Sequence, residues 1–144
     1  MDRILNVSRS YKGLAQEERR AYRRRRLIAA AVEIYGERGY HHASIKAVCH
    51  LAGLTERYFY ESFTGSEQLL IACYRKITER LLENLLQLTH NAGMDPDRLA
   101  YTLLHAYFTT IRCDPKAARV LLVEMRDANP AVVAVSRAAL LMVR

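Results

Sequence analysis

The chain has 144 residues and a formal net charge of +7, and it contains three cysteines. A chain of this length buries roughly 70% of its unfolded surface, so it can fold without a metal or a disulfide. An odd number of cysteines favours a reducing, cytoplasmic setting over a secreted disulfide scaffold. No apolar run approaches the ~18 residues of a membrane span, and the N-terminus lacks the apolar core of a signal peptide.

The positive charge is concentrated in the first third of the chain. Residues 1–50 carry 11 Lys and Arg against 5 Asp and Glu, a net charge of +6, whereas residues 51–144 carry 11 against 10. A locally basic segment indicates a polyanionic partner, nucleic acid first and an anionic membrane second. Charge alone leaves open a solvated tail that only aids solubility.

The N-terminal third begins with a predicted mobile basic arm over residues 1–15. A helix is predicted from Glu17 to Arg38, and Gly39 is expected to end it in a left-handed cap. Its apolar positions recur at helical spacing on one face, at Leu27, Ala31, Ile34 and Tyr35. Two short helices are then predicted, Ile45 to Ala52 with Ser44 as N-cap and Glu56 to Phe63 with Thr55 as N-cap.

The remaining chain is also predicted to be helical, so the fold class is all-α. A long helix should start near Ser66, with a buried stripe at Leu70, Cys73, Tyr74, Ile77, Leu81, Leu85 and Leu88. Three further helices should start at Asp95-Pro96, Asp114-Pro115 and Asn129-Pro130, because Asp or Asn caps a helix and proline suits its first position. The last of them is still apolar at Arg144, so we expect a truncated chain with further structure beyond that residue.

The stretch from Ser44 to Tyr60 has the pattern of a helix-turn-helix. Gly53 permits a three-residue turn, and Cys49 is the small residue where the two helices cross. An apolar triangle fixes the angle between the helices through Val48, Leu54 and Phe59. The side chains left exposed at the start of the second helix are Thr55, Glu56, Arg57, Tyr58 and Tyr60. An α-helix fits the major groove of DNA, where such residues reach base edges.

The segment from Leu27 to Leu70 resembles the DNA-binding domain of the TetR family. The matching positions, in the order and spacing of that family, are Ala30-Ala31, Tyr35, Gly39-Tyr40, Ser44-Ile45, Ala52-Gly53-Leu54-Thr55, Tyr60, Phe63 and Glu67-Gln68-Leu69-Leu70. The resemblance implies a three-helix DNA-binding domain over residues 16–65, then a helical effector and dimerisation domain over residues 66–144. It also implies a dimeric, ligand-responsive repressor that binds a palindromic operator in double-stranded DNA, without cofactor or membrane.

The same resemblance implies roles for individual residues in DNA binding. Ser44 would cap its helix near phosphate, Lys46 would reach a base edge or phosphate, and the Tyr60 hydroxyl would meet phosphate. Residues 55–58 would lead the recognition helix, where Arg57 could pair with guanine. Ser62 and Arg23 complete the predicted DNA-binding set.

Three positions depart from the usual family pattern. Arg57 stands where a small residue is common, Tyr58 where threonine is common, and Ser66 where a lysine often meets the DNA backbone. The run Arg23-Arg24-Arg25-Arg26 could compensate for the missing lysine, although four consecutive residues cannot all face DNA. The operator of a relative therefore does not transfer to this chain.

An effector pocket is predicted among the helices after residue 66. Tyr101, His105 and Phe108 fall near one helical face and are the candidate ligand-binding residues, with plain core packing as the alternative. The sequence contains no recognisable catalytic set and no strong zinc spacing, so we expect neither an enzyme nor a metal site. Two other classes remain as alternatives, a helix-turn-helix that binds protein and a basic membrane-surface protein.

Overall fold

The computed structural model describes residues 2–90 and 93–124, with side chains from residue 13 onward. All of the regular structure in these residues is helical, which confirms the all-α prediction. None of the described helices has both the length and the apolar character needed to cross a membrane. The helix expected after Asn129-Pro130 lies outside the described residues.

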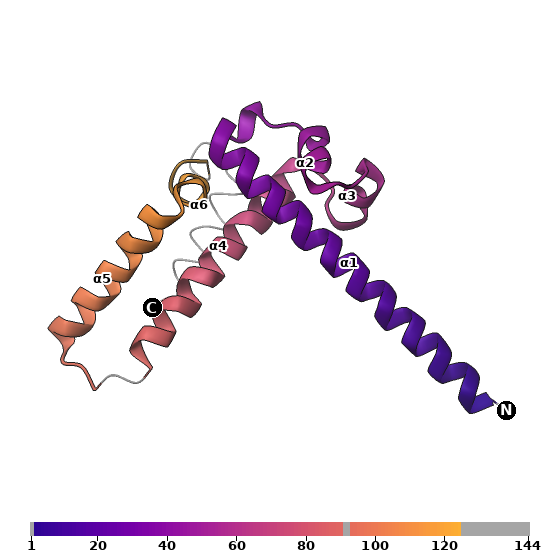
Figure 1. Cartoon of the computed structure of the whole chain (residues 1–144), viewed down its shortest axis with the longest axis horizontal. Coiled ribbons are helices and arrows are strands. Elements are labelled where there is room, and N and C mark those ends of the chain that lie inside the picture. Colours follow the sequence, from indigo (N-terminus) through magenta and orange to yellow (C-terminus); the bar gives the residue numbers. More distant parts are fainter. Residues whose placement is uncertain (1, 91–92, 125–144) are drawn as a thin grey trace.

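Helix α1 extends from Asp2 to Arg38 and is the longest element of the fold (Figure 1). The prediction of a separate arm over residues 1–15 and of a helix start at Glu17 was therefore wrong for the backbone. The physical reason is the absence of a helix breaker, because no proline precedes Pro96 and Gly13 alone does not stop a helix. The predicted buried face is confirmed, since Leu27, Ala31 and Tyr35 are almost fully buried.

Helix α1 ends at a glycine of positive φ, although not in the left-handed helical conformation that was expected. Gly39 has φ 85° and ψ 153°, an extended conformation that is essentially restricted to glycine. Its amide donates to the Tyr35 carbonyl at 3.0 Å. The chain then forms the short 3₁₀ helix η1 (Tyr40–His42) and turns toward the next helix.

Helices α2 (Ile45–Ala52) and α3 (Glu56–Ser62) pack against α1 and complete a three-helix unit. The predicted bounds of α2 and its Ser44 cap are confirmed, and α3 ends one residue earlier than expected. The shared core of this unit is apolar and continues into the next helix through Val48, Phe59, Phe63, Leu69 and Leu70.

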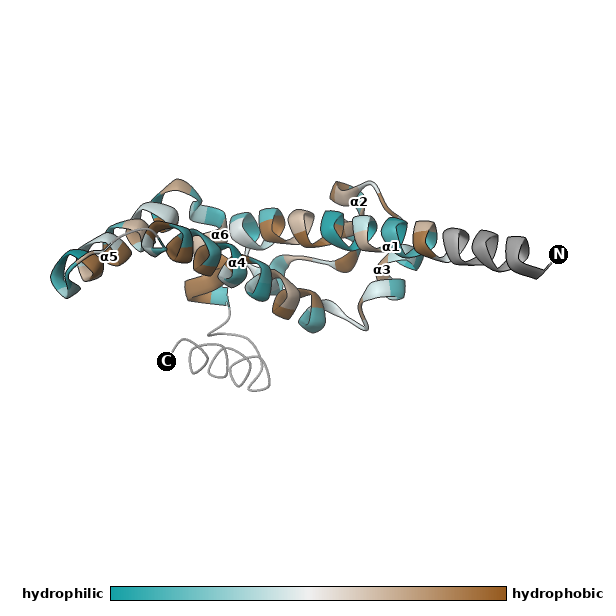
Figure 2. Ribbon diagram, turned by 90° about the horizontal axis from the view of Figure 1, so that it is seen from below, coloured by the Kyte–Doolittle hydropathy of each residue, from teal (hydrophilic) through white to brown (hydrophobic). Residues whose placement is uncertain are grey.

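Helix α4 (Ser66–Thr89) is buried only over its first half. The predicted stripe holds at Leu70, Cys73 and Tyr74, which are buried, but Leu88 is 48% exposed. Helix α5 (Pro96–Cys113) runs back alongside α4 and has no fully buried residue (Figure 1). Figure 2 shows apolar and polar residues alternating around α5.

Helix α6 (Pro115–Arg119) continues into a turn of π-helix, η2 (Val120–Glu124). Both proline signals in the described chain are confirmed as helix starts. The Asp95 carboxylate accepts from the Arg98 amide at 2.9 Å, and the Asp114 carboxylate accepts from the Ala117 amide at 3.1 Å. Together α6 and η2 pack against the C-terminal end of α1 and join the two parts of the chain.

Candidate nucleic-acid interface

The corner between α2 and α3 has the geometry that the sequence predicted. Gly53 adopts the left-handed conformation with φ 67° and ψ 34°, and the Leu54 amide donates to the Cys49 carbonyl at 3.0 Å. Cys49 is buried at the crossing of the helices, and this burial raises the pKa of its thiol. The corner therefore holds α3 at a fixed angle to α2.

The apolar triangle beneath the corner is also present. Val48 and Phe59 are fully buried, and Leu54 is half-buried against the same core. Phe59 lies against Phe63, with ring centroids 5.5 Å apart. Because Phe59 points inward, the charged residues and the tyrosines at the start of α3 are left on the outer side.

The predicted recognition residues all lie on that outer side. Thr55, Glu56, Arg57, Tyr58 and Tyr60 are exposed. The Thr55 side chain makes no capping hydrogen bond to α3, so its backbone alone forms the cap. This outer row lies at the start of α3, where a helix placed in a groove presents its side chains.

Helix α2 contributes a second group beside the first. Ser44 and Lys46 are exposed, and the Ser44 hydroxyl accepts from the Ala47 amide at 3.0 Å. A shallow groove between α2 and α3 brings Ser44 and Lys46 together with Thr55 and Glu56, and it also contains His50. Sequence reasoning did not select His50, although its place one turn after Lys46 on the same helix could have indicated it.

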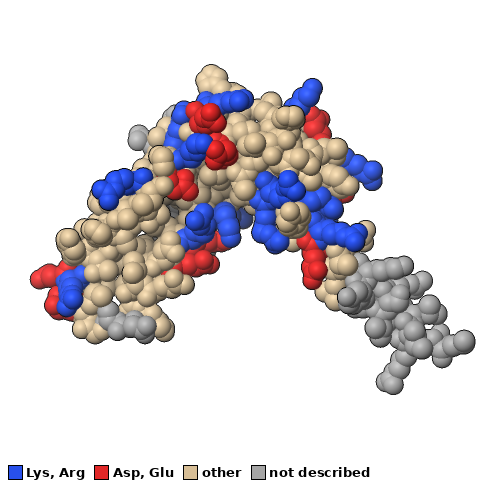
Figure 3. Space-filling model, viewed as in Figure 1, with Lys and Arg blue, Asp and Glu red and all other residues tan. Residues whose placement is uncertain are grey.

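Arg23 and Ser62 do not share the open setting of the recognition row. The Arg23 guanidinium pairs with the Glu61 carboxylate at 3.2 Å and lies over the Tyr58 ring, 4.4 Å from its centroid. Ser62 is half-buried, and its carbonyl accepts from Arg24 at 3.1 Å. Figure 3 shows Lys and Arg side chains gathered on the middle of α1, close to α3.

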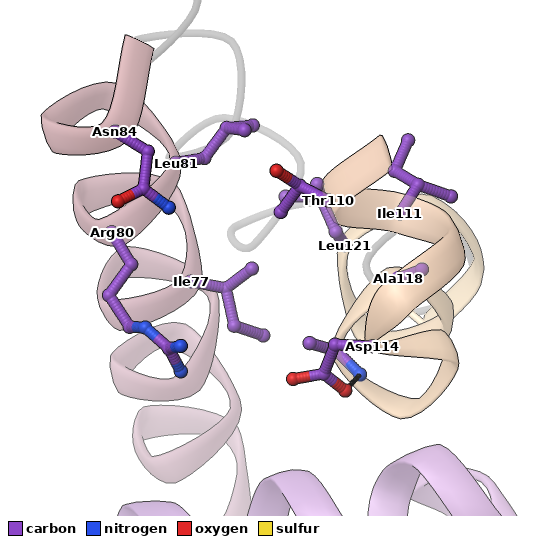
Figure 4. A pocket seen from close by; sticks show the side chains of 10 residues that line it. Ile77, Arg80, Leu81, Asn84, Thr110, Ile111, Asp114, Ala118 and Leu121 are labelled. Carbon is purple, nitrogen blue, oxygen red and sulfur yellow. Dashed lines mark hydrogen bonds between the residues drawn. The ribbon is translucent and has the colours of Figure 1, made fainter. Parts of the chain in front are cut away.

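The residues predicted to bind an effector lie on the outside of the described fold. Tyr101 is 70% exposed and Phe108 is 63% exposed, and His105 is exposed with its ring stacked on Tyr101 at 5.9 Å. A small cavity lies instead between α4 and the α5–α6 segment (Figure 4). Its walls include Ile77, Arg80, Leu81, Thr110, Ile111 and Leu121. Thr110 and Ile111, one turn or less beyond Phe108 on the same helix, line this cavity, whereas Tyr101, His105 and Phe108 do not.

A second cavity adjoins the first and lies among α1, α4 and α6. It has a volume of about 320 Å³ and shares Ile77, Arg80, Asp114 and Ala117 with its neighbour. Its walls are partly apolar, with Ile28, Ala29 and Val32 beside the shared Ile77 and Ala117. The charged side chains around it are cationic at Arg25, Lys76, Arg80 and Lys116 and acidic at Glu33 and Asp114. Lys116 forms an ion pair with Glu33, which raises the pKa of the lysine, while the other three cationic side chains form no ion pair with any described residue.

Within residues 2–90 and 93–124, no three His, Cys, Asp or Glu side chains gather in a way that could hold a metal. The site is instead a helix-turn-helix surface with a basic flank, which defines a protein of the DNA-binding helix-turn-helix class.

Comparisons with known proteins agree with this class and make it more specific. The family model described as bacterial regulatory proteins, tetR family, matches residues 27–73. The fatty acid metabolism regulator protein of Bacillus subtilis is 25% identical over 103 residues, which are 72% of this chain and 53% of that protein. The transcriptional activator FasR of Mycolicibacterium smegmatis is 26% identical over 99 residues, 69% of this chain and 45% of FasR.

Solved structures show the same fold. The fatty acid degradation regulator FadR of Bacillus halodurans superposes with a TM-score of 0.72 at 23% identity, covering 81% of this chain and 59% of FadR. A tetR family regulator from Shewanella gives a TM-score of 0.71 at 18% identity, covering 81% of this chain and 61% of that structure. The chain thus spans about half the length of the curated relatives it matches.

The part of the chain that carries the helix-turn-helix thus matches the TetR family of bacterial regulatory proteins. The matched residues 27–73 nearly coincide with the segment in which the sequence resemblance was recognised. The relatives are named as regulators and not as enzymes, in agreement with the expectation that this chain is not an enzyme.

Proposed function

We propose that the chain is a cytoplasmic, ligand-responsive transcriptional repressor that binds a near-palindromic operator as a homodimer. The observation that carries the proposal is the outward row on α3, with Arg57, Tyr58 and Tyr60 beside the exposed Lys46 of α2. In such a complex α3 enters the major groove, where Arg57 can pair with guanine O6 and N7. A two-fold dimer places its half-sites one helical turn, or a multiple of it, apart.

The effector is proposed to occupy the adjoining cavities around Ile77 and Arg80. Apolar walls, with a rim of four cationic and two acidic side chains that is net positive, favour a ligand that carries an anionic group on an apolar body. Two of the relatives are named as regulators of fatty acid metabolism or degradation, and fatty acids have this chemistry. Because the second cavity includes Arg25 of α1, a ligand there would contact the helix that supports the DNA-binding unit.

Repression requires that effector and operator prefer different states of the protein. An effector that binds the DNA-free state more tightly weakens operator binding, and linkage requires that the operator weakens effector binding by the same factor. One relative is named an activator, so the sign of regulation is part of the proposal. In vitro transcription from the selected operator should show less transcript with the protein than without it, and more transcript would overturn the repressor assignment.

DNA binding itself is tested by selecting bound sites from random duplexes and titrating the best site at several salt concentrations. Phosphate contacts release counterions, so log K should fall linearly with log salt. The dimer is tested in the same samples by sedimentation with and without DNA. A salt-independent affinity, or no binding at low ionic strength, would contradict the proposed function.

Base reading by Arg57 is tested with Arg57→Ala. Loss of a bidentate contact to guanine should reduce discrimination between the selected site and a site mutated at that base by about 1–3 kcal/mol. Arg25→Ala removes an equal charge from a different helix and should leave this discrimination unchanged. An equal loss of affinity for every DNA sequence would exclude a base-reading role for Arg57.

A further inference from the structure

Three arginines of α1 converge on the last turn of the recognition helix. Arg20 donates to the Glu61 carbonyl, and Arg24 donates to the Ser62 carbonyl at 3.1 Å. These carbonyls belong to the last turn of a seven-residue helix, where no further turn supplies amide donors for them. Cations at this end also interact favourably with the helix dipole. The arginines therefore attach the C-terminal end of α3 to α1.

Arg23 is the central member of this group and has two partners on α3. Its Nη2 lies 3.2 Å from Glu61 Oε2, and its Cζ lies 4.4 Å from the centroid of the Tyr58 ring. Glu61 and Tyr58 are three residues apart, and so lie one above the other on the same face of α3. One planar guanidinium thus spans a full turn of the recognition helix.

Burial distinguishes this contact from an ordinary surface ion pair. The Arg23 side chain is 22% exposed and that of Glu61 is 35% exposed. Arg23 Nε is buried and has no hydrogen-bond partner among the described residues. Glu61 and the Tyr58 ring thus already occupy Nη2 and one face of this guanidinium, and a phosphate would have to share the group with them.

We propose that Arg23 is a positioning residue, which fixes the orientation of the Tyr58 side chain and of α3 and thereby sets base discrimination without touching DNA. The effect on base discrimination rests on the proposed function. The contact of Arg23 with Tyr58 and Glu61 rests on the geometry alone. This positioning role replaces the sequence-based prediction that Arg23 meets the operator directly. It also accounts for a large aromatic residue at position 58, because threonine offers no ring for a guanidinium to cover.

The central test compares Arg23→Lys with Arg38→Lys, the same change at an exposed arginine near the other end of α1. A phosphate contact tolerates lysine, but lysine lacks the planar fork that stacks on a ring while it pairs with a carboxylate. Arg23→Lys should lower the ratio of operator affinity to non-specific affinity roughly threefold to thirtyfold, the range expected for a cation–π contact. The salt slope and the Arg38→Lys ratio should stay at wild-type values.

Glu61→Gln is an independent test, because the two possible roles of Arg23, positioning α3 or contacting phosphate, predict opposite changes in DNA binding. If Arg23 is positioned by Glu61, loss of the carboxylate should lower the same discrimination ratio. If Arg23 is a phosphate contact, removal of a nearby negative charge should strengthen binding to every duplex. Unchanged discrimination in Arg23→Lys, or uniformly stronger binding by Glu61→Gln, would each overturn the proposal.

The contact between Arg23 and the Tyr58 ring is measured without DNA, by NMR of the Arg23 side-chain signals. The Tyr58 ring should shift the Arg23 side-chain protons upfield, and Tyr58→Leu should remove that shift. Tyr58→Phe, which keeps the ring, and Arg57→Ala, on the same helix, should both leave it in place. Arg23 signals that do not respond to Tyr58→Leu would overturn the contact. An intact shift in a protein that ignores duplex DNA would instead mean that the proposed function has failed.

Discussion

Two buried titratable side chains, Tyr35 and Cys73, lie in the core that supports the recognition helix. Tyr35 is almost fully buried and Cys73 is fully buried. Burial raises the pKa of both side chains, that of the Cys73 thiol to about 12, and Cys73 itself adds to the shift of Tyr35. Both groups therefore remain protonated and neutral at physiological pH, as an apolar core requires.

The raised pKa values predict an alkaline limit to stability. Above pH 9 the unfolded chain loses the Cys73 proton, while the folded chain keeps it up to about pH 12. Stability present below pH 9 is therefore lost as pH rises, by up to about 1.4 kcal/mol per pH unit for each such proton. Thermal unfolding between pH 8 and pH 10 should show this fall.

Cys73→Ser should flatten that pH dependence, because serine does not titrate in this range. Cys113 is exposed, so Cys113→Ser is the matched control and should retain the wild-type slope. Equal slopes for all three proteins would show that Cys73 does not control alkaline unfolding.

Single residues were predictable where their role is local. Ser44 was identified as a cap and Cys49 as a crossing residue, because each role follows from neighbours within a few positions. The contacts of Arg23 were not predicted, because its partner Glu61 is 38 positions away and a long side chain can adopt many conformations. The sequence shows that this part of α1 is positively charged. Which of its arginines face solvent and which contact α3 depends on tertiary packing.

At the scale of elements, the helix starts carried the clearest signals. Asp95 and Asp114 cap helices as predicted, since capping requires only a short carboxylate followed by a helical turn. Helix α1 was predicted too short, because a mixed apolar and basic sequence such as residues 1–15 can be either arm or helix. The π-turn of η2 has no sequence signature of comparable strength.

The turn between α2 and α3 is an element whose geometry depends on one residue. Gly53→Ala should destabilise the chain by about 1–2 kcal/mol, because the φ of 67° is unfavourable for a residue with a Cβ. The added carbon would also lie 3.2 Å from Arg26 Nη2. Gly53→Asn should cost less, since asparagine enters this conformation more readily.

Gly65→Ala is the matched control for that measurement. Gly65 has a φ of −177°, which any residue adopts, and nothing lies within 4 Å of an added Cβ. Its unfolding midpoint in urea should equal or exceed that of the wild type. A Gly53→Ala protein as stable as Gly65→Ala would show that the turn does not need its left-handed residue.

At the scale of the whole molecule, α1 belongs to both halves of the fold. Its middle supports α2 and α3, and its C-terminal end packs against α6 and η2 (Figure 1). The buried Glu124 carboxylate joins these parts, since it accepts from the Tyr40 amide at 2.8 Å and from Arg119 Nε at 2.9 Å. Long-range contacts of this kind could not be predicted from helix patterns, which locate apolar faces but not their partners.

The same limit explains the exposed row on α5. Tyr101 and Phe108 share a face, as the spacing predicted, but the pattern does not say which neighbour covers that face. In the described fold α5 meets α4 and α6 through other positions, among them Thr110 and Ile111. Periodicity therefore identified the shared face of Tyr101 and Phe108 but not which residues of α5 line the cavity.

Gly36 is a point where α1 lies directly against α6. A Cβ on Gly36 would lie 2.6 Å from Lys116 Cα and 2.8 Å from the Lys116 carbonyl oxygen, so α6 would have to move away. Gly36→Ala should therefore destabilise the chain by about 1–3 kcal/mol, the usual effect of overpacking. Gly13→Ala, at an open position of the same helix, should instead be neutral or stabilising by up to about 1 kcal/mol.

Hydrogen exchange distinguishes loosening between the halves from general instability. In Gly36→Ala the amides of residues 115–124 should exchange faster, because they depend on the contact with α1, while those of α2 and α3 should retain their protection. Uniformly faster exchange would mean that the two halves unfold as one unit. Unchanged stability and unchanged exchange would show that α6 accommodates the methyl group, and that the junction is looser than the close approach of Gly36 to Lys116 implies.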